Sequence, residues 1–177
     1  MKKLAQVDVS WTLFLDRDGV INKRIFGGYI LDYADFRFKE GVLESSKELF
    51  EKFTRVIVVT NQQCVAKGLI SEAELAVLHE KMLGDFQNAG STIDRVYAAL
   101  ELKDSAPFMR KPHPMMAELA RQEFPEVFNS RMFCGSLPSC FAPLTNNRNS
   151  NGTKPNPRAA PKAAICRRAT QARIHRP

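Results

Sequence analysis

The fold of this chain is decided by one stretch of sequence, Phe14-Leu15-Asp16-Arg17-Asp18-Gly19-Val20-Ile21-Asn22. It continues a short apolar run, Trp11 to Leu15, which predicts a buried strand. Asp16 and Asp18 follow two residues apart, so on an extended continuation both carboxylates can face one pocket. There one carboxylate can attack a phosphorus atom while the other passes a proton to the leaving oxygen. The alternative is a solvated turn, because Asp-Gly pairs are common turn formers. The position after an apolar strand favours a site.

Predicted strands and helices alternate along the first 134 residues. The β-branched run Arg55 to Thr60 predicts a second strand, and Ser71 with Glu74 forms a capping box that begins a helix ending close to Ala89. His79 lies in this helix among charged residues, and we expect it on the surface. The remaining elements are a helix containing residues 42–53, a strand at 93–99, a helix at 115–124 and a strand at 131–134. This order predicts an α/β fold, a Rossmann-like parallel sheet flanked by helices, with a ligand crevice at the carboxyl ends of the strands.

The positive charge of the chain belongs to its end alone. The net charge is +7. Residues 1–134 contain 18 Lys and Arg against 19 Asp and Glu, whereas residues 135–177 contain 8 Lys and Arg and no acid. The second segment is also rich in Pro and shows no helical or strand periodicity, so we expect a disordered tail. The prediction is therefore one domain at 1–134 and a basic tail at 135–177.

Four cysteines show neither C-x-x-C pairs nor His at zinc-finger spacing, which predicts reduced thiols rather than disulfides. No signal-peptide core follows the N-terminus, and no apolar run approaches the roughly 20 residues that cross a bilayer. We expect a cytoplasmic monomer without membrane contact.

Two further motifs accompany the opening stretch, Val59-Thr60-Asn61-Gln62 and Arg110-Lys111-Pro112-His113-Pro114. Together the three resemble the first three motifs of the haloacid dehalogenase (HAD) superfamily. Within it they resemble subfamily IIIA, which contains the heptose 1,7-bisphosphate and histidinol-phosphate phosphatases. The resemblance covers Thr12 to Cys134 and implies a Rossmann-like fold without a large cap domain.

The resemblance implies a role for each carboxylate of the opening stretch. Asp16 is expected to be the nucleophile that forms an aspartyl-phosphate, and to bind Mg²⁺. Asp18 is expected to act as general acid and then base, and to give its backbone carbonyl to the same Mg²⁺. The metal would offset the repulsion between the nucleophile and an anionic substrate.

The other two motifs are expected to bind substrate. Thr60 and Asn61 would bind the transferring phosphoryl group, and Gln62 would shape the substrate pocket. Lys111 would neutralise phosphoryl charge and Arg110 would grip the substrate with its planar fork. Read without the resemblance, the first pair is equally compatible with a helix N-cap, and Arg110-Lys111 with an exposed basic turn.

The chain departs from the family pattern in two places. Related sequences often hold zinc before the Arg-Lys-Pro motif, but the loop Glu101 to Pro107 has no thiol or imidazole. We therefore expect no zinc, and a loop held by packing alone. The fourth motif should supply an acid after a strand, yet Met132-Phe133-Cys134-Gly135-Ser136-Leu137 contains none. This predicts a domain that is incomplete at its C-terminus, through a shifted reading frame or a truncation, with weak metal binding and impaired turnover.

The sequence thus favours a Mg²⁺-dependent phosphatase acting on a small phosphorylated sugar similar to heptose bisphosphate. Two alternatives stay open. The basic tail could bind nucleic acid, although only Phe141 is available for base stacking and we do not favour it. The chain could also be a non-catalytic protein that retains a phosphate pocket.

Overall fold

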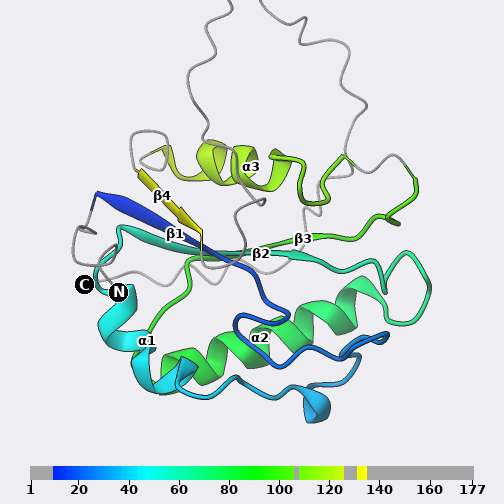
Figure 1. Ribbon diagram of the computed structural model, residues 1–177, viewed down its shortest axis with the longest axis horizontal. Coiled ribbons are helices and arrows are strands. Elements are labelled where there is room, and N and C mark those ends of the chain that lie inside the picture. The colour runs from blue at the N-terminus through cyan, green and yellow to red at the C-terminus, as the bar shows by residue number, and fades with distance from the viewer. Residues whose placement is uncertain (1–9, 106–107, 126–130, 135–177) are drawn as a thin grey trace, which may run out of the picture. The chain divides into compact units, whose positions relative to one another are not determined.

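The computed structural model of the 177-residue chain describes residues 10–105 and 108–125, and the backbone of residues 131–134. All of them belong to the first of two compact units, Met1–Ala142. The predicted tail at 135–177 lies outside the described residues. Strands and helices alternate as expected (Figure 1): β1(Trp11–Leu15), α1(Val42–Phe50), β2(Arg55–Asn61), α2(Glu72–Asn88), β3(Arg95–Ala99), α3(Met115–Glu123) and β4(Arg131–Cys134).

The four strands form one parallel sheet in the order β3-β2-β1-β4. Leu13 pairs with Val56 in β2, and on its other side with Phe133 in β4. From β1 the chain builds outward through β2 and β3, and then returns to place β4 beside β1. The direction of winding therefore reverses at β1, which is where parallel α/β sheets open a ligand crevice at the carboxyl ends of their strands. The predicted fold class is confirmed.

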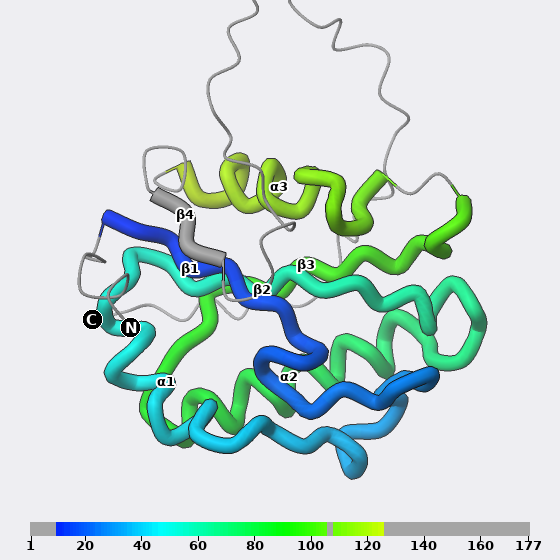
Figure 2. Tube along the Cα trace, viewed as in Figure 1, coloured from blue at the N-terminus to red at the C-terminus, as the bar shows by residue number. Residues whose placement is uncertain are grey.

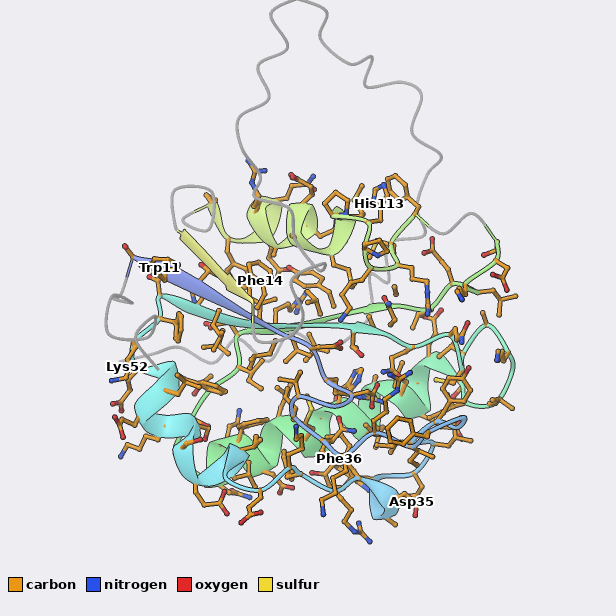
Figure 3. All side chains as sticks on the ribbon, in the orientation of Figure 1. Trp11, Phe14, Asp35, Phe36, Lys52 and His113 are labelled. Atoms are coloured by element: carbon orange, nitrogen blue, oxygen red, sulfur yellow. The ribbon has the colours of Figure 1, made fainter. Side chains whose placement is uncertain are left out.

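Helices cover both faces of the sheet. α1 and α2 lie on one face and α3 on the other (Figures 1 and 2). Alternate side chains of β1 divide between the two layers, because successive residues of a strand point to opposite faces. Leu13 packs in a cluster with Met82 and Phe86 of α2, while Phe14 packs with Met116 of α3. Figure 3 shows Phe14 on the α3 side of the sheet and Phe36 on the α2 side.

Helix α2 begins as its sequence predicts. The side chain of Ser71 accepts a hydrogen bond from the backbone of Glu74, and the Glu74 carboxylate accepts one from the Ser71 backbone. Gly90, with φ of +78°, follows its end. The expectation for His79 was wrong, because its side chain is buried, with 8% exposed. Its position one turn after Leu75 places it on the apolar face of the helix.

No inserted cap domain is present in the described part of the chain. The connection from β1 to α1 is a loop of residues 16–41 whose one helical element is the short turn η2(Tyr33–Asp35). In the same described ranges, every helix is too short or too polar to span a bilayer. Cys64 is buried as a free thiol.

Candidate active site

A cavity of about 220 Å³ opens at the carboxyl ends of β1 and β2. It collects residues from all three predicted motifs, which lie far apart in the sequence. Of the seven predicted site residues, six line it: Asp16, Asp18, Thr60, Asn61, Arg110 and Lys111. Its other walls come mainly from the loop after β1, including Arg24 and Tyr29, and from Gln63.

The predicted nucleophile, Asp16, directly follows the last residue of β1. Its Oδ1 accepts a hydrogen bond from the backbone N–H of Arg17 at 2.8 Å. Its Oδ2 lies 2.8 Å from Nζ of Lys111, whose side chain is 7% exposed. The same Nζ donates to the carbonyl of Val59 in β2 at 2.9 Å. The backbone of β2 therefore holds the Lys111 ammonium group beside the Asp16 carboxylate, which follows the neighbouring strand β1.

Asp18 lies in a denser network of hydrogen bonds. Its carboxylate accepts from Arg17, from Asn22 Nδ2 at 3.0 Å and from Gln62 Nε2 at 2.7 Å. Burial alone would raise the pKa of Asp18, but the charge of Arg17 and these hydrogen bonds outweigh it, so the pKa lies below its usual value. In this arrangement Asp18 is anionic at neutral pH.

The guanidinium of Arg17 is almost completely buried, with 1% exposed. It is paired with Asp18, and its Nη2 also donates to Gln62 Oε1 at 3.1 Å. Its Nη1 donates to His79 Nε2 at 3.1 Å, which requires that nitrogen to be unprotonated. Burial, together with the charge of Arg17, lowers the pKa of His79 to about 3. His79 is therefore a neutral acceptor that connects α2 to the loop of Asp18.

Thr60 lines the cavity, and Gln62 lies behind it. Both are buried, and Gln62 Nε2 donates to Thr60 Oγ1 at 2.8 Å. Because its amide is also bonded to Asp18 and Arg17, Gln62 faces the protein network, and the neighbouring Gln63 lines the cavity instead. Contact between Gln62 and a substrate stays a prediction.

Asn61 is used to hold the third motif. Its Oδ1 accepts from the backbone N–H of Lys111 at 2.9 Å, and its Nδ2 donates to the Lys111 carbonyl at 3.4 Å. Arg110, by contrast, lines the cavity with an uncommitted donor: Nη1 is buried and has no hydrogen-bond partner. An unpartnered buried guanidinium nitrogen is costly, so an acceptor from a ligand would stabilise it.

The loop before Arg110 corrects one expectation. It is not held by packing alone, because the carboxylate of Glu101 accepts hydrogen bonds from the backbone N–H groups of Phe108, Met109 and Arg110. His113 is exposed and packs its ring against Phe108 at 5.1 Å between centroids, as expected of a loop residue (Figure 3).

The oxygen donors of the pocket fit Mg²⁺, which is commonly held by one or two carboxylates together with water and substrate phosphate oxygens. Asp16 supplies a carboxylate that faces the cavity, and Asp18 lines the same wall. Within residues 10–105 and 108–125, no group of three or more His, Cys, Asp or Glu side chains gathers to hold a metal by itself. The position expected for a fourth-motif acid follows Gly135 and lies outside the described residues.

Sequence reasoning missed three residues that support the site. Arg17 stands between the two aspartates but had no assigned role in the chemistry. His79 could have been placed inside from its helical spacing to Leu75 and Met82. Glu101 stands two residues after the end of β3, and a polar residue at that edge of a parallel sheet is a signal for the site.

Comparison with known proteins bears on the family and the fold of the chain. No protein-family model matches the chain. A D-glycero-alpha-D-manno-heptose-1,7-bisphosphate 7-phosphatase from Mycobacterium tuberculosis is 35% identical over 104 residues, which are 59% of this chain and 55% of that protein. The enzyme of the same name from Campylobacter jejuni is 32% identical over 123 residues, covering 70% of this chain and 69% of that protein.

The chain belongs to the HAD-like heptose bisphosphate phosphatase family. A crystal structure of D,D-heptose 1,7-bisphosphate phosphatase from B. bronchiseptica, complexed with magnesium and phosphate, superposes with a TM-score of 0.59 at 26% identity. The match covers 64% of this chain and 63% of that chain. This member of the HAD-like family spans only 55% of the length of the mycobacterial relative.

Proposed function

We propose that this chain hydrolyses a phosphomonoester of a sugar bisphosphate through an aspartyl-phosphate on Asp16. The observation that carries the proposal is the position of Asp16, whose carboxylate follows the central strand β1 and faces a cavity beside the ammonium group of Lys111. A cation at this point attracts a phosphoryl group to the carboxylate that would attack it. The names of the relatives supply the substrate class, a heptose bisphosphate.

In the first step an oxygen of Asp16 forms a bond to phosphorus and the bond from phosphorus to the sugar oxygen breaks. The leaving oxygen takes a proton from Asp18. In the second step water attacks the phosphorus, gives a proton to Asp18, and the bond from phosphorus to Asp16 breaks to release inorganic phosphate. The pKa of Asp18 lies below its usual value in the free protein, and the negative charge of a bound phosphoryl group would raise it, which favours the protonated acid that the first step needs.

The phosphoryl group is bound by Lys111 and by residues at the end of β2. Lys111 would release Asp16 in part and interact with a phosphoryl oxygen, since its Nζ stays fixed to the Val59 carbonyl. The Thr60 hydroxyl already accepts a hydrogen bond from Gln62, which leaves its own proton free to donate. Asn61 would contribute mainly by holding Lys111, because its side-chain amide is bonded to the backbone of that residue.

The part of the substrate that does not react is bound by other residues that line the cavity. Arg110, whose buried Nη1 has no partner, and Arg24 are both among them. Two guanidinium groups suit an anionic or strongly polar substrate group. A bisphosphorylated sugar carries such a group. Histidinol phosphate is the alternative substrate, and it lacks a second phosphate.

Mg²⁺ is proposed as the cofactor, held by the Asp16 carboxylate and the Asp18 backbone carbonyl. When bound, it would neutralise charge on the phosphoryl group and so offset its repulsion from Asp16. A cytoplasmic location and a monomeric state stay predictions.

The test is phosphate release by the full chain from D-glycero-D-manno-heptose 1,7-bisphosphate and from histidinol phosphate, with Mg²⁺ and with chelator. Asp16→Asn is compared with Asp104→Asn, which alters an exposed carboxylate. We expect release that requires Mg²⁺, is abolished by Asp16→Asn and is unchanged by Asp104→Asn. Equal silence of the wild-type chain and Asp16→Asn would reject catalysis by this chain.

A further inference from the structure

Four consecutive backbone N–H groups, those of residues 108–111, each donate a hydrogen bond to a side chain from elsewhere in the fold. The first three go to the carboxylate of Glu101, at 3.0 Å to Oε1 and at 2.8 and 3.2 Å to Oε2. The fourth goes to Oδ1 of Asn61 at 2.9 Å. Such a run of N–H groups is ordinarily bonded within a helix or a strand, or to water. Here the side chains of Glu101 and Asn61 accept the hydrogen bonds that a helix or strand would otherwise accept.

The two acceptors are brought together by the sheet. Asn61 is the last residue of β2 and is paired with Ala99, the last residue of β3. Glu101 follows Ala99 by two residues, so both acceptors stand where neighbouring parallel strands end. A further bond, from the Gln62 N–H to the Ala99 carbonyl at 2.7 Å, continues the pairing beyond the strands. The distance between Asn61 and Glu101 is therefore set by the pairing of β2 with β3.

The segment that they hold carries both cations of the third motif. Lys111 reaches inward to Asp16, and Arg110 lies along the cavity wall. Hydrogen bonds to an ionised carboxylate are stronger than those between neutral groups. Removing the carboxylate would leave three N–H groups to find water, and the segment would sample other conformations. Lys111 would then spend less time beside a phosphoryl group, and Arg110 less time beside the rest of the substrate.

We infer that Glu101 is a positioning residue, which fixes the segment 108–111 so that Lys111 faces the phosphoryl group and Arg110 faces the rest of the substrate. The inference rests on the proposed function, because it assigns a purpose to the site described there. Glu101 does not line the cavity and is not bonded to Asp18. It acts on the site through its hydrogen bonds to the backbone of residues 108–110.

The test compares Glu101→Gln and Glu101→Ala with the wild-type chain. Glutamine keeps one acceptor oxygen and the shape of the side chain, but loses the charge and the second acceptor. Asp104→Asn is the matched control, since it neutralises an exposed carboxylate in the same loop. Two quantities are measured on the full chain: amide hydrogen exchange at residues 108–110, and the dissociation constant for inorganic phosphate in the presence of Mg²⁺.

We expect Glu101→Gln to raise the phosphate dissociation constant by about tenfold, and Glu101→Ala by more, with faster exchange at residues 108–110. Asp104→Asn should change neither. If Glu101→Ala does not fold, Glu101→Gln decides the matter alone. Faster exchange with unchanged phosphate affinity would overturn the inference, because the segment would then be loosened without effect on the site.

The outcome is separable from that of the proposed function. Suppose that the wild-type chain binds phosphate more tightly than Glu101→Gln does, but releases none from sugar phosphates. That result would support the positioning role of Glu101 and reject catalysis. If the wild-type chain and Glu101→Gln release phosphate equally well, catalysis is supported and the positioning role of Glu101 is rejected. A wild-type chain that binds no phosphate would overturn both.

Discussion

Lys111 places its Nζ 2.8 Å from Oδ2 of Asp16, although the two residues belong to motifs at opposite ends of the described chain. The Lys111 side chain is nearly buried, whereas the carboxylate of Asp16 is open to the cavity. The Lys111 ammonium group therefore reaches Asp16 from the protein interior, and the Asp16 carboxylate is accessible to a ligand in the cavity.

Removal of the Lys111 charge should abolish most activity. Lys111→Met keeps the length of the side chain but removes the cation beside the transferring phosphoryl group. We expect kcat/KM for the sugar bisphosphate to fall by about 10²- to 10³-fold, as for other preorganised donors of charge stabilisation. Steady-state phosphate release measures it, with Lys103→Met, which alters an exposed side chain, as control. Equal activity of the two variants would remove Lys111 from the phosphoryl site.

Arg110 should affect the substrate more than the phosphoryl group. Arg110→Lys keeps a positive charge but loses the planar fork, including the buried Nη1 that has no partner in the protein. We expect KM for heptose bisphosphate to rise by about tenfold while the affinity for inorganic phosphate stays within about twofold. Arg121→Lys on α3 is the control. A parallel loss of phosphate affinity would instead place Arg110 at the phosphoryl group.

His79 should make stability depend on pH. Its pKa is about 3 in the folded chain and 6.5 ordinarily, so below about pH 6.5 the unfolded chain binds a proton that the folded chain does not. The free energy of unfolding should therefore fall as the pH falls. Between about pH 7.5 and about pH 5.5 this one group contributes a loss of about 1.4 kcal/mol.

The comparison for His79 is His79→Gln, which can still accept the hydrogen bond of Arg17 but does not titrate. Urea unfolding at both pH values should show a smaller loss of stability in the variant than in the wild-type chain, by about the amount above. An identical loss in both proteins would show that His79 is protonated, or is exposed, in the folded state.

Phe86 should be among the most costly core residues to truncate. It is fully buried in α2 and its ring lies 5.6 Å from those of Phe38 and Phe50, between centroids. We expect Phe86→Ala to lower the free energy of unfolding by about 3 to 5 kcal/mol. Val77→Ala, at an exposed position of the same helix, should change it by less than about 0.5 kcal/mol. Chemical denaturation of both variants decides the comparison.

Strand and helix positions followed closely from the sequence because their signals are local. β1 was predicted at its observed bounds, and α2 differed by one residue at each end, because Ser71 and Ala89 cap the helix and are not themselves helical. The helix at 42–53 was predicted too long: it ends at Phe50, and Phe53 packs into the core from the turn that follows. Apolar spacing does not distinguish a last helical turn from a buried residue just after it.

The site was predictable to the extent that each motif ends a strand. The carboxyl ends of parallel strands share one edge, and this places Asp16 near Thr60 and Asn61 without further information. The hydrogen-bond partners of these side chains could not be predicted in the same way. Asn61 is bonded to Lys111, and Gln62 to Asp18, because of loop conformations that have no periodic signal in the sequence.

The most direct test of the central claim is covalent trapping of the phosphoryl group on Asp16. The full chain is mixed with heptose bisphosphate labelled with ³²P at the 7-phosphate in the presence of Mg²⁺, quenched with acid and analysed for radioactive protein. We expect label on the protein that hydroxylamine removes, that maps to the peptide containing Asp16, and that is absent from Asp16→Asn. Phosphate release without label on the protein, or label that persists in Asp16→Asn, would contradict it.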